Sequence, residues 1–471
     1  MKNQIKTMKA TLSHSVNIET LVYSSNLSLS YFSRLQHLPW AMLLRSAAEG
    51  HPNNRYDILV ANPIATLITK DELTQVTLYT ENNVTTHESN QDPFELLEHY
   101  QSKLLPPLSP IDNIPFIGGA LGYFSYDLGR RIETIPRTAA EDIPTADMAI
   151  GIYEWALIID HQLKRAYFVG QNLEHHKQWL TEQEKTRDED FRLTSAWSSN
   201  MTKSEYSEKF NIIQEYLHSG DCYQINLAQR FTASYQGSEW QAYQKLENSN
   251  HAPFSAFIRT NELAVMSISP ERFLLLNNDS SKLNIETKPI KGTRPRSLDP
   301  QEDAELAHQL KNAEKDQAEN LMIVDLLRND IGRVAKPGTV TVPLLFEIES
   351  FPAVHHLVST IRAELGSQQS AFTLLRACFP GGSITGAPKI RAMQIIEELE
   401  PHRRNLYCGS IGYISRCGNM DSNITIRTLL AHQGNLYSWA GGGIVADSEM
   451  EAEYQETLDK VSRILPILSD S

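Results

Sequence analysis

Two short segments rich in proline and glycine limit how the middle of this chain can fold. They are Ser269-Pro270-Glu271-Arg272-Phe273 and Pro289-Ile290-Lys291-Gly292-Thr293-Arg294-Pro295-Arg296. Two prolines and a glycine restrict the second segment to a stiff, non-helical path. The sequence therefore predicts that Glu271 and Lys291 are held in a rigid bracket, on either side of a hairpin.

Lys291 is the residue in this bracket with the most varied chemistry. Its neighbours in sequence include Lys288, Arg294 and Arg296, and nearby positive charge disfavours the ammonium form of an amine. A neutral lysine is a nucleophile. A solvated basic loop is the alternative, and residue types alone favour that alternative.

The two segments resemble corresponding blocks of the chorismate-utilising enzymes, and the resemblance runs from about Tyr31 to the C-terminus. It implies an α/β (α+β) composite fold with two face-packed β-sheets surrounded by helices. It also implies an enzyme that converts chorismate and ammonia to 4-amino-4-deoxychorismate, a step toward p-aminobenzoate and folate. In that reaction Glu271 would be the general acid, and Lys291 would form a covalent adduct. Anthranilate synthases, by contrast, carry alanine at the lysine position.

A chain of 471 residues exceeds the size at which one core normally stops growing. We expect an N-terminal extension (1–30), a region with a tryptophan-type pocket (31–195) and a chorismate-binding catalytic region (196–468). The two sheets are expected to draw strands from both halves. Local patterns predict a helix that begins with a capping box of Thr202 and Glu205 and ends at Gly220. A strand over 222–233 follows it.

Net charge and cysteine usage restrict the partners of the chain. A formal charge of -14 argues against binding nucleic acid or anionic membranes, so an anionic substrate needs a local positive pocket. Four cysteines make no disulfide framework, and no apolar run suits a signal peptide or membrane span. We therefore expect a soluble, cytoplasmic protein. No cysteine sits in a G-x-C-x-G elbow, so a separate glutaminase subunit is expected to deliver the ammonia.

Two further segments argue against other reactions. By resemblance, Gln224 stands where isochorismate and salicylate synthases carry a lysine that activates water, and glutamine cannot act as that base. The glycine-rich loop Gly381–Lys389 opens a helix, but Ile390 follows the lysine where a phosphate loop needs Ser or Thr. A second glycine-rich block, 117–124, is interpreted as a structural turn.

Acidic pairs occur on two predicted helices that lie far apart in sequence. Asp316 and Glu319 form one pair, and Glu453 and Glu456 form the other, on a helix for which we predict a capping box of Ser448 and Glu451. Either pair alone would be interpreted as solvated surface. Together they resemble the Mg²⁺ site of the family, with Glu319 and Glu456 as direct ligands and the other two binding through water.

The resemblance also implies a set of side chains around the substrate. They are Thr293, His356, Tyr407, Arg427, Gly441, Gly443 and Lys460. For His356 alone a core histidine is the alternative, because the adjacent His355 is equally eligible. A tryptophan pocket is implied by residues from both halves: Ser46, Asn53, Asn54, Arg55, Tyr56, Pro253, Phe254 and Ser255. Arg45 stands where the feedback-regulated enzymes carry a glutamate, which argues against feedback control but is compatible with tryptophan as a structural ligand. An ordinary sheet interior is the alternative.

Two other functions are disfavoured by particular residues. An anthranilate synthase component I is disfavoured by Lys291 and Arg45. A non-catalytic or regulatory subunit is disfavoured because Glu271, Lys291, Glu319, Arg427 and Glu456 are all present.

Overall fold

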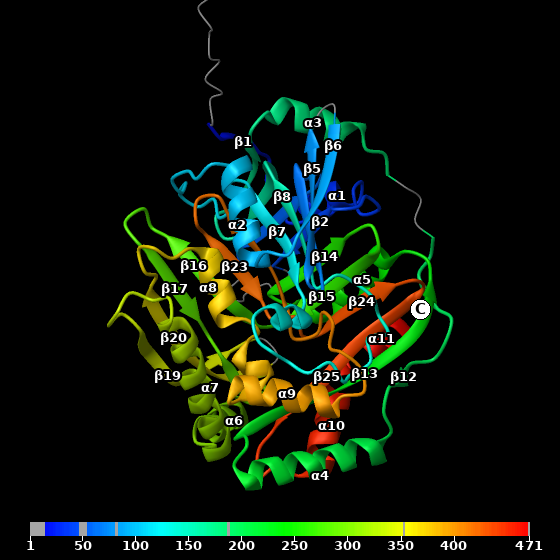
Figure 1. The fold of residues 1–471 in the computed structure, drawn as a ribbon, viewed down its shortest axis with the longest axis vertical. Coiled ribbons are helices and arrows are strands. Elements are labelled where there is room, and N and C mark those ends of the chain that lie inside the picture. Colours follow the sequence, from blue (N-terminus) through cyan, green and yellow to red (C-terminus); the bar gives the residue numbers. More distant parts are fainter. Residues whose placement is uncertain (1–14, 47–53, 81–82, 186–188, 352–353, 470–471) are drawn as a thin grey trace, which may run out of the picture.

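Two large antiparallel sheets make up the centre of the molecule (Figure 1). The computed structural model describes residues 15–46, 54–80, 83–185, 189–351 and 354–469. Within these residues the first sheet has 13 strands and the second has 12. Both sheets mix strands from before and after residue 195, as expected.

The first sheet follows the order β1-β10-β9-β3-β2-β14-β15-β24-β25-β13-β11, with β12 and β21 also paired to β13. Its strands are β1 (Asn17–Leu21), β2 (Met42–Arg45), β3 (Tyr56–Val60), β9 (Trp155–Asp160), β10 (Arg165–Gly170), β11 (Arg192–Leu193), β12 (Ser198–Ser199), β13 (Gln224–Gln236), β14 (Phe254–Arg259), β15 (Leu263–Ser269), β21 (Gly386–Ala387), β24 (Thr428–His432) and β25 (Asn435–Ile444).

The second sheet follows the order β18-β20-β17-β16-β23-β22-β7-β8-β4-β5-β6, with β19 paired to β20. Its strands are β4 (Ala65–Lys70), β5 (Leu73–Thr80), β6 (Asn83–Ser89), β7 (Gly119–Phe124), β8 (Met148–Tyr153), β16 (Arg272–Asn278), β17 (Leu283–Thr287), β18 (Ile290–Pro295), β19 (Thr341–Ser350), β20 (Val354–Glu364), β22 (Ser410–Ser415) and β23 (Met420–Asn423).

Helices surround the two sheets (Figure 1). They are α1 (Leu27–Phe32), α2 (Pro93–Leu104), α3 (Leu173–Glu182), α4 (Lys203–Ser219), α5 (Glu239–Asn250), α6 (Pro300–Lys311), α7 (Glu314–Gly332), α8 (Ala371–Cys378), α9 (Lys389–Leu399), α10 (Met450–Val461) and α11 (Leu465–Ser469). No helix in the described ranges is long and apolar enough to cross a membrane.

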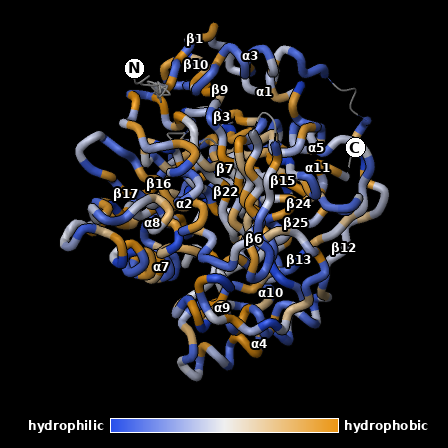
Figure 2. Tube along the Cα trace, turned by 45° about the horizontal axis from the view of Figure 1, so that its top comes forward, coloured by the Kyte–Doolittle hydropathy of each residue, from blue (hydrophilic) through white to orange (hydrophobic). Residues whose placement is uncertain are grey.

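The alternation of side chains along the strands explains the layers. Met42 and Ile58 face a core shared by both sheets, whereas their neighbours Leu43 and Leu59 face a second core that is covered by α1, α3, α5 and α11. Successive residues of a strand point to opposite faces, so both faces of this sheet are buried. Figure 2 shows hydrophobic segments concentrated among the central strands. The predicted composite α/β fold is confirmed.

Several local predictions are confirmed. The helix α4 has the predicted capping box of Thr202 and Glu205, and Gly220 ends it in the left-handed conformation. The strand predicted over 222–233 is β13, which runs a few residues further. The four cysteines are free and buried: Cys222, Cys378, Cys408 and Cys417.

One other prediction needs correction. The block at 117–124 is mostly the central strand β7 rather than a turn: a Cβ at Gly122 would lie 2.1 Å from the Ala149 carbonyl oxygen, so its glycine permits close strand contact. Two further features lie outside the predictions. The run 148–160 divides at Glu154 into β8 and β9, which belong to different sheets. Within the expected N-terminal extension, β1 pairs with β10.

Candidate active site

The bracket predicted around Glu271 and Lys291 is present. Glu271 lies between the end of β15 and the start of β16, and β16 and β17 form an antiparallel hairpin. Lys291 lies on β18, which follows the hairpin. Gly292 has φ +80°, and a Cβ there would lie 2.8 Å from the Asp316 carboxyl carbon. Glycine is therefore required where β18 meets α7.

Three predicted cationic side chains surround the buried carboxyl group of Glu271, which is 9% exposed. Burial raises the pKa of this group to about 7, although Lys291, Lys460 and Arg427 oppose the shift. The Ser383 hydroxyl donates a hydrogen bond to the carboxylate and also opposes it. A carboxyl group with this pKa carries a proton for part of the time near neutral pH, as a general acid must.

The reason given above for a neutral Lys291 is wrong. Lys288, Arg294 and Arg296 each have a carboxylate partner, namely Glu349, Asp316 and Asp303. Their charges are therefore compensated locally. Lys291 itself lies 3.7 Å (Nζ to Oε2) from Glu319 on α7. Sequence neighbours do not reveal such pairing, because the carboxylates come from other elements.

Carboxylates from the two distant acidic pairs do converge. Glu453 and Glu456 on α10 lie over Gly442 of β25, where a Cβ would be 3.0 Å from Glu453 Oε2 and 3.5 Å from Glu456 Oε1. Burial raises the pKa of Glu453, and the negative charges of Glu456 and Glu319 raise it further. Figure 1 places α9 beside β13 and α10 beside β25, whereas α7 lies against β18 and β20.

Lysines and an arginine lie against these carboxylates. Glu453 is 3.9 Å from Lys315, Glu456 is 2.5 Å from Lys460, and Asp316 is 3.3 Å from Arg294. Within the described residues no three His, Cys, Asp or Glu side chains are grouped to hold a metal ion. The donor set nevertheless suits Mg²⁺, a hard cation that binds through one or two carboxylates and keeps several waters.

The capping box predicted for α10 is wrong. The helix begins at Met450, Glu449 is its N-cap, and no side chain caps it. Ser448 lies outside the cap and instead donates a hydrogen bond to Glu453 Oε1 at 2.6 Å. This bond orients one of the four acidic side chains.

Two of the predicted substrate side chains bond to each other across a pair of strands. Thr293 on β18 lies opposite His356 on β20, and Thr293 Oγ1 is 2.8 Å from His356 Nδ1. Burial and the charge of Arg427 lower the pKa of His356 to about 4, so the ring is neutral at neutral pH. His355 instead contacts Ser350 and Asp303. The two adjacent histidines therefore have different partners, and His356 is the one that contacts Thr293.

The remaining predicted substrate residues lie on or beside β25. Lys460 Nζ donates to the Gly441 carbonyl oxygen at 2.7 Å. A Cβ at Gly443 would lie 2.5 Å from the amide nitrogen of Gln224, which is fully buried. The Tyr407 ring stacks on Trp439, two residues before Gly441, with an interplanar angle of 7°.

The glycine-rich loop before α9 is held by internal contacts. Lys389 Nζ bonds to the buried carboxylate of Asp330 at 2.5 Å and to the Cys378 carbonyl oxygen at 3.1 Å. This lysine is therefore engaged within the protein, in agreement with the argument against a phosphate loop. Ser383 in the same loop reaches Glu271. The sequence analysis assigned no role to this serine, because its partner lies more than 100 residues away.

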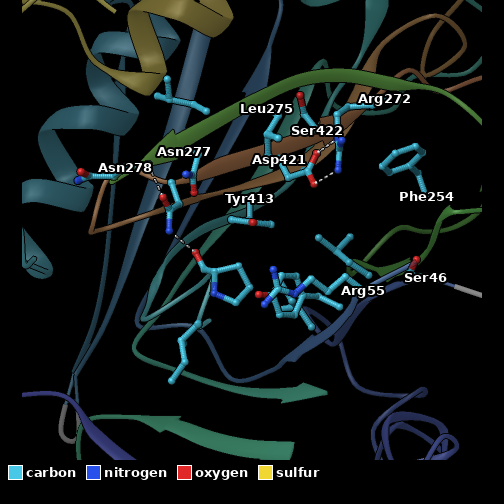
Figure 3. A pocket seen from close by; sticks show the side chains of 18 of the residues that line it. Ser46, Arg55, Phe254, Arg272, Leu275, Asn277, Asn278, Tyr413, Asp421 and Ser422 are labelled. Atoms are coloured by element: carbon cyan, nitrogen blue, oxygen red, sulfur yellow. Dashed lines mark hydrogen bonds and ion pairs between the residues drawn. The ribbon is translucent and has the colours of Figure 1, made fainter. Parts of the chain in front are cut away.

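A separate cavity of about 650 Å³ is lined in part by residues of β16 (Figure 3). Its lining includes six of the eight residues predicted for a tryptophan pocket: Ser46, Arg55, Tyr56, Pro253, Phe254 and Ser255. Asn54 does not line the cavity, and Asn53 lies outside the described residues. Glu271 and Lys291 are not part of the lining. This cavity is thus not the place where the acid and the lysine meet.

The Arg272–Asp421 ion pair in the cavity wall was not predicted from the sequence. The position of Arg272 directly after Glu271, in the same motif, is the sequence feature that could have pointed to Arg272.

Comparison with known proteins agrees with this geometry. The family model described as chorismate binding enzyme matches residues 41–466. The chain is 57% identical over 447 residues to "Aminodeoxychorismate synthase component 1" of Escherichia coli strain K12, covering 95% of this chain and 97% of that protein. It is 59% identical over 436 residues to the protein of the same name from Klebsiella aerogenes, with 92% and 95% covered.

The solved structure of anthranilate synthase component I from Streptococcus pneumoniae superimposes with a TM-score of 0.75 at 30% identity. The match covers 88% of this chain and 93% of that one. Both the family model and these relatives span nearly all of the chain. The chain therefore belongs to the family of chorismate binding enzymes.

Proposed function

We propose that this chain is an aminodeoxychorismate synthase component 1, which converts chorismate and ammonia to 4-amino-4-deoxychorismate on the route to p-aminobenzoate and folate. Relatives with that name, at 57% and 59% identity over nearly their full length, support the assignment. The observation that carries it is the lysine on β18, directed to the same cluster as the buried acid Glu271. By resemblance, an anthranilate synthase has alanine at this position.

Glu271 is the general acid of the proposed reaction. With a pKa of about 7, its carboxyl group can donate a proton to the C4 hydroxyl group, which leaves as water. Burial keeps bulk water from competing for this proton, and the Ser383 hydrogen bond orients the carboxyl group.

Lys291 is the proposed nucleophile. Its amine forms a bond to C2 of the ring, the double-bond electrons shift, and the C4–oxygen bond breaks as Glu271 supplies the proton. Ammonia then attacks C4, the electrons shift back, and the C2–nitrogen bond breaks to release the lysine. The enolpyruvyl group is retained throughout. No residue is assigned to the loss of pyruvate.

Substrate carboxylates require positive charge in a protein whose formal charge is -14. Arg427 and Lys460, both within electrostatic reach of Glu271, are proposed to supply it. Thr293, His356 and Tyr407 are proposed to give hydrogen bonds, and the neutral His356 ring has both a donor and an acceptor nitrogen. Gly441 and Gly443 leave room for the substrate beside β25.

Mg²⁺ is the proposed metal. Glu319 and Glu456 would hold it directly, and Asp316 and Glu453 would hold it through water. When bound, the metal would offset the charge of the ring carboxylate and withdraw electron density from the diene. The lysines that now neutralise Glu319 and Glu456 would then be free to change partners.

A separate glutaminase is proposed to supply the ammonia. The relatives are named as component 1, which supports a second component. All four cysteines of this chain are buried, and none stands in a nucleophile elbow. The partner would bind this chain as a heterodimer.

The cavity lined in part by β16 is proposed to hold tryptophan as a structural ligand. Aromatic side chains of Tyr56, Phe254 and Tyr413 line it. Its arginines already have carboxylate partners, which suits a ligand without net charge. Mass spectrometry of the purified, denatured protein would detect one released tryptophan per chain; recovery of none would contradict the proposal.

One product assay tests the main assignment. The purified chain receives chorismate, magnesium and either ammonium or glutamine, and the products are identified by mass spectrometry. We expect 4-amino-4-deoxychorismate with ammonium and very little with glutamine. Formation of anthranilate would overturn the assignment, and efficient use of glutamine by the chain alone would overturn the proposed partner.

A further inference from the structure

Arg272 directly follows Glu271 but belongs to the wall of the cavity. Its guanidinium group donates to both carboxylate oxygens of Asp421 on β23, at 2.9 Å (Nε to Oδ1) and 3.0 Å (Nη2 to Oδ2) (Figure 3). The same group lies 5.0 Å from the centre of the Phe254 ring on β14. Both members of the ion pair line the cavity. Glu271 is not part of the lining.

The backbone directly after Arg272 is irregular. Arg272 pairs with Asn423 and Leu274 pairs with Ser422, so the register between β16 and β23 shifts at Phe273. A bulge of this kind redirects side chains and interrupts the ladder of hydrogen bonds. At the entry to β16 the ladder of backbone hydrogen bonds is therefore incomplete, so side-chain contacts help to fix the chain there.

The contacts that do remain lead to the same neighbouring segment. The Glu271 carbonyl oxygen accepts from the Ile424 amide at 3.1 Å, and Ser269 Oγ donates to the Ile424 carbonyl oxygen at 2.6 Å. Ile424 lies three residues after Asp421 on the same chain segment. The ion pair and the Ile424 contacts therefore fasten both sides of Glu271 to one segment.

We propose that Arg272 and Asp421 form a positioning pair for Glu271, fixing the entry to β16 so that the acid points at the departing hydroxyl group. A bidentate arginine–carboxylate pair fixes orientation as well as distance, which a single hydrogen bond does not. The pair touches no reacting atom. The inference rests on the proposed role of Glu271 as general acid.

Three variants test the pair: Arg272→Ala, Asp421→Asn and the double variant. A displacement of about 1 Å at the reacting group can cost on the order of 10²-fold in rate. We expect each single variant to lower kcat between about 10-fold and 100-fold and to leave KM for chorismate within about twofold. The double variant should lose no more than the worse single variant, because both changes break one interaction.

Arg259 and Glu239 provide a matched control at the opposite end of β14. This pair is 2.8 Å apart, and Arg259 lies 5.6 Å from the ring of another β14 phenylalanine, Phe257. The side-chain exposures are 18% and 20%, against 12% and 25% for Arg272 and Asp421. Arg259→Ala should lower thermal stability to a similar degree but leave kcat unchanged.

Kinetics with chorismate, magnesium and ammonium, and a thermal unfolding curve for each variant, decide the matter. The positioning role would be overturned if folded Arg272→Ala or Asp421→Asn had wild-type kcat. It would also be overturned if the losses in kcat were additive in the double variant, or if Arg259→Ala lost as much kcat. Glu271→Gln separates the two proposals. If this variant turns over normally, the acid role itself fails; if it is strongly impaired while Arg272→Ala is normal, only the positioning inference fails.

Discussion

The catalytic cluster and the cavity both adjoin the start of β16, but different cations face their carboxylates. In the cavity wall the arginines are tightly paired: Arg45 with Glu247 at 2.6 Å, and Arg55 with Asp160 at 3.2 Å. In the catalytic cluster, lysines face the carboxylates over a range of distances: Lys460 is 2.5 Å from Glu456, whereas Lys291 is 3.7 Å from Glu319.

Residue type explains this difference. Arginine presents a planar fork that fixes a carboxylate, whereas lysine is a point charge on a flexible chain that changes partners easily. The cavity's charges are therefore satisfied before any ligand arrives, and the cluster's charges can be rearranged by substrate. Substitutions that remove a charge should lower kcat when they are made in the catalytic cluster, and should lower stability when they are made in the cavity wall.

Lys291 should show the largest effect. Loss of a covalent nucleophile removes a whole reaction path, so Lys291→Ala should lower formation of 4-amino-4-deoxychorismate on the order of 10⁴-fold or more. Lys291→Arg should fail as badly, because guanidinium stays protonated. Product analysis checks both variants. Partial activity in the arginine variant would mean that the residue holds a carboxylate.

Glu271 should come next. Glu271→Gln should lower kcat by about 10²–10⁴-fold, the usual contribution of general acid catalysis. The wild-type reaction needs the protonated carboxyl group, so kcat/KM should fall as pH rises through about 7, the pKa that burial gives this group. The glutamine variant should lack this decline. A pH profile of each protein checks the prediction, and an identical decline in the variant would contradict it.

The carboxylates should show a metal-dependent effect. Glu319→Ala and Glu456→Ala should each raise the magnesium concentration for half-maximal activity by at least roughly 10-fold, while folding is retained. Glu451 is a control on the same helix, since it pairs with Lys203 at the surface and its side chain is 68% exposed. Glu451→Gln should leave the magnesium titration unchanged. Wild-type magnesium dependence in both test variants would mean that these carboxylates are not ligands.

Arg45 should have the smallest effect on turnover and a large effect on stability. Removing its guanidinium group leaves the buried Glu247 without its cationic partner, and breaking such a pair costs about 3–5 kcal/mol. Denaturant unfolding of Arg45→Ala measures this loss. A stable variant with strongly reduced kcat would erase the contrast between the two regions.

Sequence patterns predicted regular elements well where local chemistry decides them. The helix α4 is an example, because its cap, apolar face and final glycine all lie within one segment. They failed at β7, where glycine serves a close contact with Ala149 from another strand. They failed again at Ser448, which bonds a metal-site candidate instead of capping a helix.

The same limit applies to the candidate site. Resemblance supplied Glu271, Lys291 and the acidic pairs, but partners such as Ser383 and Asp421 come from elements more than 100 residues away. The sequence also could not show that the positive charges next to Lys291 are paired with distant carboxylates. Pairing across elements is a property of the fold that no local motif contains.

The covalent role of Lys291 is the central claim, and one measurement tests it directly. The wild-type protein is incubated with chorismate and magnesium but no ammonia, denatured rapidly, digested and mapped by mass spectrometry. The account predicts a peptide containing Lys291 whose mass has increased by that of chorismate less one water, and no such peptide from Lys291→Ala. An unmodified wild-type peptide, under conditions in which added ammonium gives product, would contradict the covalent mechanism.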